Sequence, residues 1–281
     1  MEPSVDLPSS PALAGRPLRV AATGDVHCSD ECLEAIETAF AAVSAEADVL
    51  LLAGDLTTHG EPRQAAAMAS VAHSLSIPVL AVLGNHDWHV DRRDDVMAEL
   101  AKGGIEVLEG GSRVLNLAGR TVGVAGVKGF VGGFEGGSLL ADFGEPALRK
   151  LHRITEHEVS ALDGALEQIS GCDVRIALLH YSPTPDTLVG EQEAIWMFLG
   201  SDRLAAPIAK HRPDLVLHGH AHAGSFEGKV GSVPVYNVSM QVTRRPYLVF
   251  EIEPAPRPGP PGQLSASASD GAVTNSSKLS G

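Results

Sequence analysis

Short apolar runs alternate with amphipathic stretches along the first hundred residues of the chain. The runs are rich in Val, Leu and Ala and show little polar alternation, which is typical of strands buried on both faces. Three runs lie at residues 18–22, 48–53 and 77–83, and helical patterns follow them at 31–45, 62–74 and 91–102. This strand–helix repeat predicts an α/β fold with an at least partly parallel sheet.

The rest of the pattern is less regular and predicts a second set of strands. A glycine-rich loop at 129–137 and one long helix at 145–169 interrupt it. The other expected strands lie at 105–108, 113–117, 121–125, 174–179, 215–217, 233–238 and 247–252, with a helix near 201–211. The last two strands are expected to complete an antiparallel set.

Both ends of the chain lack apolar periodicity and are rich in Pro, Ser, Ala or Gly. Residues 1–16 are therefore interpreted as a disordered lead-in and 254–281 as a disordered tail, which leaves one folded domain at 17–253. The 281 residues are 44% hydrophobic, enough for a sizeable core. No apolar run has the length of a membrane span, and the N-terminus does not resemble a secretory signal.

Charge and cysteine content narrow the function classes. The formal net charge of −14 disfavours a nucleic-acid partner, because such partners are bound through basic patches. The three cysteines, Cys28, Cys32 and Cys172, are too few and too irregularly spaced for a disulfide framework. We therefore expect reduced thiols and a cytoplasmic location. The sequence does not indicate an oligomeric state.

Polar clusters follow five of the apolar runs, where buried strands are expected to end. These clusters are Gly24-Asp25-Val26-His27, Gly54-Asp55, Gly84-Asn85-His86-Asp87, His180 and Gly219-His220-Ala221-His222. In open α/β sheets, ligands bind beyond the carboxyl ends of the strands. Asp, Asn and His are ligands for a borderline or hard divalent metal, so the pattern predicts a metal site at this edge.

The number of candidate ligands indicates two ions rather than one. If strand alternation extends to the first cluster, Asp25 and His27 point the same way. Asp55 is a carboxylate that could bridge two cations, and Asn85 offers an amide oxygen. His180, His220 and His222 bring the total to seven protein ligands. Two ions about 3.5–4 Å apart are the arrangement used to hydrolyse phosphate esters.

These five clusters, in this order and spread, resemble the calcineurin-like metallophosphoesterase superfamily over residues from about 18 to 252. The resemblance implies a four-layer αββα sandwich with a dimetal site at the strand ends. It implies that the first metal is held by Asp25, His27 and His222, the second by Asn85, His180 and His220, and that Asp55 bridges them. The family's metals are usually Mn, Fe or Zn, and the ligand set does not choose among them.

The same resemblance implies hydrolysis of a small phosphodiester, such as a cyclic nucleotide, or of a phosphomonoester. A metal-bridging hydroxide would attack phosphorus in line while His86 protonates the leaving oxygen. Asp87 is expected to hold the other ring nitrogen of His86. A non-catalytic metal- or nucleotide-binding regulatory module is the alternative, and a nuclease is a weaker one.

Substrate contacts are less well specified by the pattern. Asn85 and His89 lie close to the predicted metal site in sequence, and Lys128, Phe130 and Phe134 lie in or beside the glycine-rich loop. The backbone amides of such a loop can cradle phosphate, although glycines can equally serve only tight turns. We expect these residues to line one side of the substrate site. His218 is interpreted as a packed structural histidine.

Overall fold

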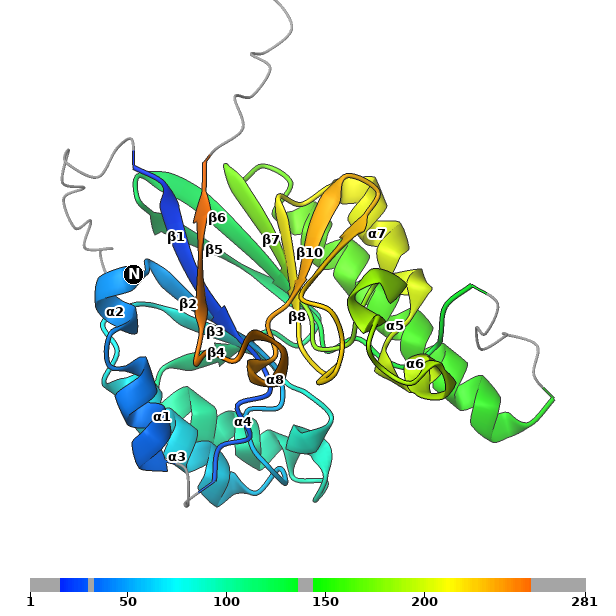
Figure 1. Cartoon of the computed structure of the whole chain (residues 1–281), viewed down its shortest axis with the longest axis horizontal. Helices are drawn as coiled ribbons and strands as arrows, with labels where there is room; N and C mark the ends of the chain where they lie inside the picture. Colours follow the sequence, from blue (N-terminus) through cyan, green and yellow to red (C-terminus); the bar gives the residue numbers. More distant parts are fainter. Residues whose placement is uncertain (1–15, 30–32, 136–143, 254–281) are drawn as a thin grey trace, which may run out of the picture.

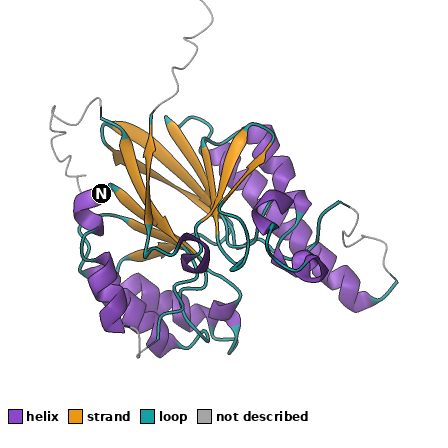
Figure 2. Ribbon diagram, viewed as in Figure 1, coloured by secondary structure: helices purple, strands orange, loops and turns teal. Residues whose placement is uncertain are grey.

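The computed structural model describes residues 16–29, 33–135 and 144–253. The predicted tail, nearly all of the lead-in, Cys32 and the end of the glycine-rich loop lie outside these residues. Two mixed sheets form the centre, and helices cover the outer face of each, so the chain is a four-layer sandwich (Figures 1 and 2). The predicted fold class is therefore confirmed.

The first sheet has the strand order β11-β1-β2-β3-β4. Strands β1 to β4 run parallel, and β11 pairs antiparallel with β1 at one edge. The strands are β1 (Leu18–Thr23), β2 (Val49–Ala53), β3 (Val79–Val82), β4 (Ile105–Val107) and β11 (Leu248–Ile252). Its helices are α1 (Leu33–Phe40), α2 (Val43–Glu46), α3 (Pro62–His73) and α4 (Arg93–Lys102).

The second sheet has the order β5-β6-β7-β8-β10-β9, with antiparallel strands at both edges. Its strands are β5 (Gly111–Leu117), β6 (Arg120–Gly126), β7 (Val174–Leu178), β8 (Leu215–His218), β9 (Glu227–Val230) and β10 (Val233–Asn237). The long helix α5 (Pro146–Gln168) and α7 (Ala205–His211) cover it, and the short helices are α6 (Trp196–Leu199) and α8 (Met240–Thr243). The described residues also include four 3₁₀ turns: η2 (His86–Trp88), η3 (Pro185–Leu188), η4 (Glu193–Ile195) and η5 (Asp202–Leu204).

Burial on both faces explains the nearly unbroken apolar runs. Along β2, Leu50 and Leu52 pack into the core beneath the first helix layer, whereas Leu51 packs into the core between the sheets. The inter-sheet core joins side chains of both sheets, including Val20 and Ile176. A strand with a core on each side needs no polar face, so its apolar run is continuous.

Several elements differ from the sequence prediction. The last two strands do not form one antiparallel set, because β10 pairs parallel with β8 while β11 joins the first sheet. The helix expected at 31–45 is divided into α1 and α2, and α4 begins only at Arg93 because Asp91 has a left-handed backbone, with φ of 54°. Strand β9 was not predicted, since its residues Glu227 and Lys229 are exposed and polar. Within the described residues, no helix has both the length and the apolar character needed to cross a membrane.

Candidate metal centre

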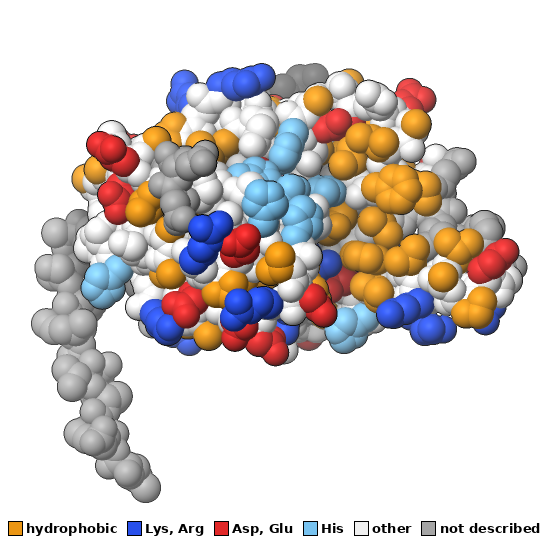
Figure 3. Space-filling model, turned by 90° about the horizontal axis from the view of Figure 1, so that it is seen from below, with side chains coloured by type: hydrophobic (Ala, Val, Ile, Leu, Met, Phe, Trp, Pro, Cys, Tyr) orange, Lys and Arg blue, Asp and Glu red, His pale blue; other side chains and the backbone are white. Residues whose placement is uncertain are grey.

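The carboxyl ends of strands from both sheets meet at one side of the sandwich. Asp25 and His27 follow β1, Asp55 follows β2 and Asn85 follows β3. The second sheet supplies its histidines from the ends of β7 and β8, and these are His180, His220 and His222. Figure 3, which views the molecule from below Figure 1, shows histidine side chains gathered in the middle of this face. Five chain segments that are distant in sequence therefore converge at one place.

Six of the seven candidate ligands form two groups that share one carboxylate. Ligand atoms of Asp25, His27, Asp55 and His222 lie within 4.8 Å of one another, as do those of Asp55, His180 and His220. Asn85 adjoins the second group, because its Oδ1 lies 3.0 Å from His180 Nε2. Asp55 belongs to both groups, with Oδ1 3.5 Å from His180 Nε2 and Oδ2 3.8 Å from His27 Nε2. A carboxylate shared by two ligand groups in this way could bridge two ions.

The backbone at four candidate ligands is left-handed, which is uncommon for residues other than glycine. The φ angles are 57° at Asp25, 46° at His27, 50° at Asp55 and 70° at His220. Strand alternation therefore does not place Asp25 beside His27, because β1 has already ended at Thr23. Instead, the two loops are joined by hydrogen bonds from Asp25 N to Gly54 O (3.0 Å) and from His27 N to Asp55 O (2.9 Å). Such backbone strain is typical of functional sites held by their surroundings.

Two glycines make room for the ligands of neighbouring strands. A Cβ added at Gly84 would lie 2.1 Å from Asp55 Oδ1, and one added at Gly54 would lie 2.4 Å from His180 Nδ1. Gly54 also has a φ of 84°, which favours glycine. The glycine that precedes a ligand in these clusters thus allows a second ligand, from another strand, to approach closely.

The electrostatics of the site favour bound cations. Burial raises the pKa of Asp55 to about 9, and the nearby charges of Asp25 and Asp87 add to this rise. Burial also acts to raise the pKa of Asp25, but the hydrogen bond from His222 and the charges of the surrounding histidines lower it to about 2. The pKa of His27 falls to about 4 through burial, so its imidazole is neutral. A neutral imidazole is the form in which histidine binds a divalent ion, and such an ion would supply the positive charge that the crowded, buried carboxylates lack.

Backbone carbonyls fix the orientation of two imidazoles. His180 Nδ1 donates to Ala53 O (2.8 Å), which leaves Nε2 directed toward Asn85 and Asp55. His86 Nδ1 donates to Thr58 O (2.8 Å), and its Nε2 lies 4.0 Å from Asp55 Oδ2. A carbonyl oxygen can only accept, so Nδ1 carries the proton in both rings. The donor set therefore fits two cations, with His86 beside them.

The structure corrects the role expected for Asp87. Its buried carboxylate does not hold the His86 ring, which is bonded to the Thr58 carbonyl instead. It accepts from Leu56 N (3.2 Å), Thr57 N (2.8 Å), Thr57 Oγ1 (2.7 Å) and Gly84 N (2.8 Å). Asp87 thereby ties the loop after β2 to the loop after β3, and acts on the site through the backbone.

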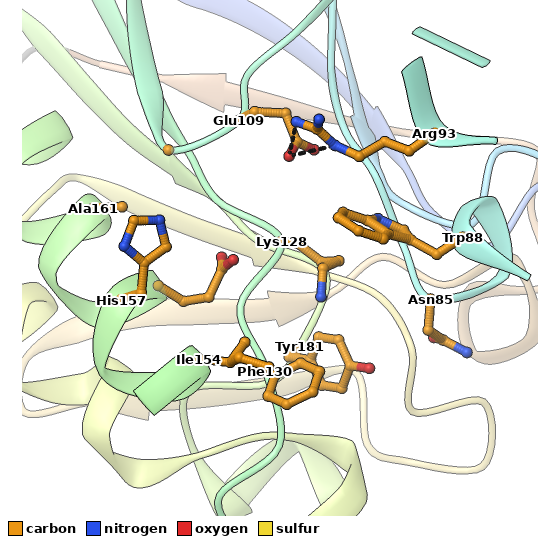
Figure 4. Close-up of a pocket in the computed structure, with 12 residues that line it drawn as sticks. Asn85, Trp88, Arg93, Glu109, Lys128, Phe130, Ile154, His157, Ala161 and Tyr181 are labelled. Atoms are coloured by element: carbon orange, nitrogen blue, oxygen red, sulfur yellow. Dashed lines mark hydrogen bonds and ion pairs between the residues drawn. The ribbon is translucent and has the colours of Figure 1, made fainter. Parts of the chain in front are cut away.

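A cavity of about 560 Å³ adjoins Asn85, and Lys128 and Phe130 line it (Figure 4). The expectation for Phe134 is wrong, because this side chain is buried among Leu188, Leu199 and Ala221. Its loop is held down by hydrogen bonds such as Gly133 N to Gly200 O, which turn the ring inward. His89 lies outside the cavity, with its ring centroid 4.3 Å from that of His86.

Nine of the twelve residues that line the cavity were not anticipated from the sequence, among them Trp88, Tyr181 and Glu158. Trp88 and Tyr181 each lie close to a predicted site residue in sequence, which was a usable signal. Glu158 lies in the middle of α5, where a charged residue is ordinary, so no signal distinguished it. His218 is buried as expected, with Nε2 2.8 Å from Thr187 Oγ1.

A sandwich of two mixed sheets with an Asp/His cluster at its strand ends is the architecture that the sequence resemblance implied, that of a metallophosphoesterase. The family described as calcineurin-like phosphoesterase matches residues 18–224, and the chain belongs to this family. The superfamily generally hydrolyses phosphoesters with divalent metals. No curated protein matches the chain.

Solved structures of low sequence identity share the fold. Phosphopantetheinyl hydrolase (PptH) from Mycobacterium tuberculosis is 15% identical with a TM-score of 0.64, and the match covers 88% of this chain and 100% of the hydrolase chain. The protein TT1561 of Thermus thermophilus is 20% identical with a TM-score of 0.54, covering 84% of this chain and 99% of the other. A putative 5′-nucleotidase from Staphylococcus aureus is 14% identical with a TM-score of 0.52, covering 78% of this chain but 48% of the other.

Proposed function

We propose that this protein hydrolyses a small organic phosphoester, either a phosphodiester such as a cyclic nucleotide or a phosphomonoester, at a centre of two divalent ions. One observation carries the proposal: two groups of ligand atoms share the Asp55 carboxylate. A single structural metal would need one group of about four ligands. Two ions joined by a carboxylate suit phosphoryl transfer to water, since they stabilise both the attacking and the leaving oxygen.

The first ion would be held by Asp25, His27 and His222, with Asp55 as the bridge. The second would be held by three further residues, namely Asn85, His180 and His220. Mn, Fe or Zn all suit this set of carboxylate, amide and imidazole ligands. When bound, the ions would lower the pKa of a water and polarise the phosphoryl group. The chain's own residues must then orient the ester and supply a proton to the departing alcohol.

His86 is the group placed to supply that proton. Its Nδ1 proton is held by the Thr58 carbonyl, so the donated proton would come from Nε2 of the doubly protonated ring, 4.0 Å from the Asp55 carboxylate. The ring is partly exposed, since 32% of its side chain is accessible, so it can meet a substrate without rearrangement. Asp87 supports this geometry by holding the backbone on either side of the loop. An alkoxide leaving group gains most from such an acid.

The adjoining cavity would receive the organic part of the ester. Lys128 and Phe130 line it, and Asn85 belongs both to the cavity wall and to the ligand set. Two structural neighbours are named as a phosphopantetheinyl hydrolase and a putative 5′-nucleotidase, and these names point to substrates with a sizeable organic part. A ligand of that size fits a cavity of about 560 Å³.

A metal- or nucleotide-binding regulatory module remains the rival function. The His86 ring favours the enzyme, because a module that only binds metal does not need an imidazole fixed beside the ligands. A nuclease is less well supported, given the net charge of −14.

The test compares hydrolysis of bis(p-nitrophenyl) phosphate and p-nitrophenyl phosphate by metal-stripped protein reloaded with Mn²⁺, Fe²⁺ or Zn²⁺. His86→Ala should lower turnover by about 10²–10⁴-fold while two ions remain bound. His73→Ala, an exposed histidine on α3, serves as the matched control and should turn over normally. Absence of turnover with any of the metals, in protein shown to hold two ions, would favour the regulatory module.

A further inference from the structure

The cavity beside the metal centre has a wall of aromatic rings and a set of charged side chains. It lies between the turn η2, the end of β6 and the long helix α5 (Figure 4). Trp88, Phe130 and Tyr181 form the wall on the side of Asn85, and Ile154 and Ala161 of α5 contribute apolar surface on the other side. Asn85 marks the end of the cavity that opens toward the candidate metal ligands.

Lys128 projects into this cavity and is held by rings rather than by a carboxylate. Its Nζ lies 5.4 Å from the ring centroid of Trp88, 4.7 Å from Phe130 and 5.3 Å from Tyr181. It donates one long hydrogen bond, to Gly129 O at 3.4 Å. Among the described residues, no carboxylate oxygen lies within 4.0 Å of it. The ammonium therefore keeps donor capacity for an acceptor on a ligand.

Two carboxylates line the same cavity. Glu158 Oε2 accepts from Gly129 N at 2.9 Å, and Glu109 Oε2 accepts from Arg93 Nη2 at 2.7 Å. In the described part of the chain, the second oxygen of each carboxylate has no hydrogen-bond donor. Burial raises the pKa of Glu158, and the charge of Lys128 acts against this rise. A ligand N–H would supply the missing partner.

We propose that this cavity binds the alcohol part of the ester, and that this alcohol carries a planar edge with an N–H donor beside a carbonyl or ring-nitrogen acceptor. The donor would bond Glu158, and the acceptor would bond Lys128. Such an edge occurs in nucleobases and in amides. The proposal rests on the proposed phosphoesterase function, because it interprets the cavity as the site of the leaving alcohol.

The balance of charge in the cavity supports a neutral group with both polarities. Arg93 and Glu109 already form an ion pair, with Nη2 and Oε2 2.7 Å apart. Lys128 and Glu158 attract one another electrostatically but are not in contact within 4.0 Å in the structure. A second phosphate would bring an uncompensated anion close to Glu158 and Glu109. A planar amide-type edge satisfies the ammonium and the carboxylate together, and its flat body fits between apolar walls.

The cavity holds a natural reporter for this proposal. The chain has two tryptophans, and only Trp88 lines the cavity. Trp196→Phe therefore leaves a single tryptophan there. Nucleosides, ribose, N-acetylethanolamine and ethanolamine would be titrated into this protein without metal, with fluorescence excited at 295 nm and calorimetry as an independent readout. Saturable binding of nucleosides but not of ribose is expected. Binding of N-acetylethanolamine but not of ethanolamine or nucleosides would assign the edge to an amide chain.

Variants on α5 separate recognition from general effects. Glu158→Gln should weaken binding about tenfold or more, because a hydrogen bond to a charged group is lost. Glu167→Gln, on the same helix but 70% exposed, is the matched control and should bind normally. Ala161→Phe fills part of the cavity without changing a charge, and it should abolish binding even if Glu158→Gln fails to fold.

Binding of ribose as tight as that of nucleosides, no binding of either nucleosides or N-acetylethanolamine, or unchanged affinity in Glu158→Gln would overturn the proposal. These titrations need no metal. A failure of binding beside normal metal-dependent hydrolysis therefore removes only this inference, whereas binding without any hydrolysis removes the enzyme function.

Discussion

Replacing Asp87 by Asn tests whether this carboxylate is a structural link or a direct partner of His86. Its Oδ1 accepts from Thr57 N and Thr57 Oγ1, and its Oδ2 accepts from Leu56 N and Gly84 N. An NH₂ group in place of Oδ2 would face two backbone N–H groups, whereas in place of Oδ1 it would face Thr57 N and the Thr57 hydroxyl, which can turn and accept. The second orientation is therefore favoured, and it loses the hydrogen bond from Thr57 N. Each bond to a charged group is worth about 1.5–3 kcal/mol.

Neutralising the side chain also removes some of the cost of burying a charge, since burial raises the pKa of Asp87. The net loss should therefore be about 2 kcal/mol, which lowers the melting temperature by about 4–8 °C in a domain of this size. Calorimetry of the metal-free protein measures this directly. Asp94→Asn, whose side chain is 91% exposed on α4, is the matched control and should stay within about 0.5 kcal/mol. A normal melting temperature for Asp87→Asn, together with lost hydrolysis, would refute the structural role and restore a direct one on His86.

Two further predictions concern the metal centre. Gly84→Ala should lower Mn²⁺ affinity and hydrolysis at least about 10²-fold, because the added Cβ would lie 2.1 Å from Asp55 Oδ1 and must displace it by about an ångström. Titration calorimetry with Mn²⁺ measures the affinity. Gly111→Ala is the control, because its added Cβ would meet no atom within 4 Å, and it should bind Mn²⁺ normally. Equal affinities for the two variants would contradict the argument. The metal-free protein should also lose stability as the pH rises from about 6.5 toward 9. The pKa of Asp55 is about 9 in the folded protein but near 3.8 in the unfolded chain. Over this pH range the folded protein holds a proton that the unfolded chain has already released, so rising pH favours unfolding. It should lose stability on the acid side as well, because His27 and His218 each have a pKa of about 4 when folded and stay neutral, while both imidazoles take up a proton below about 6.5 when unfolded. Two such groups outweigh the opposite contribution of Asp55 in this range. Saturating Mn²⁺ should abolish the alkaline loss in thermal melts, and a metal-free profile that is flat from pH 6.5 to 9 would be inconsistent with the buried carboxylate.

The sequence predicted well what depends on neighbouring residues in the chain. Runs such as 48–53 are apolar throughout because β2 is buried on both faces, and the polar residues that end them mark the carboxyl edge of the sheets. The order of these clusters was enough to predict a shared site. The contact between Gly84 and Asp55 also has a signal in the sequence, because a glycine is needed where Asp55 approaches so closely.

Features set by distant partners could not be predicted in this way. The apolar pattern of 247–252 indicates a strand, but its pairing with β1 depends on the whole sheet. Phe134 lies in a loop whose course is fixed by hydrogen bonds to residues near 200, so its inward direction has no local signal. Asp87 is next to His86 in sequence, yet its carboxylate accepts hydrogen bonds from backbone N–H groups of another loop instead of contacting the His86 ring. Glu158 is a candidate contact only because α5 borders the cavity, and the sequence around Glu158 does not indicate that cavity.

The candidate ligands come from both sheets, and this has a consequence for the unfolded chain. His222 Nε2 lies 2.9 Å from Asp25 Oδ1 although 197 residues separate them. Cations held by both sheets would act as cross-links that close long loops. A cross-link restricts the unfolded chain more strongly when the loop that it closes is longer. Metal affinity and folding free energy would then be parts of one linked equilibrium. Chelation should make the backbone amides at this end of both sheets exchange faster with solvent, while those at the opposite end, held by the inter-sheet core, keep their protection.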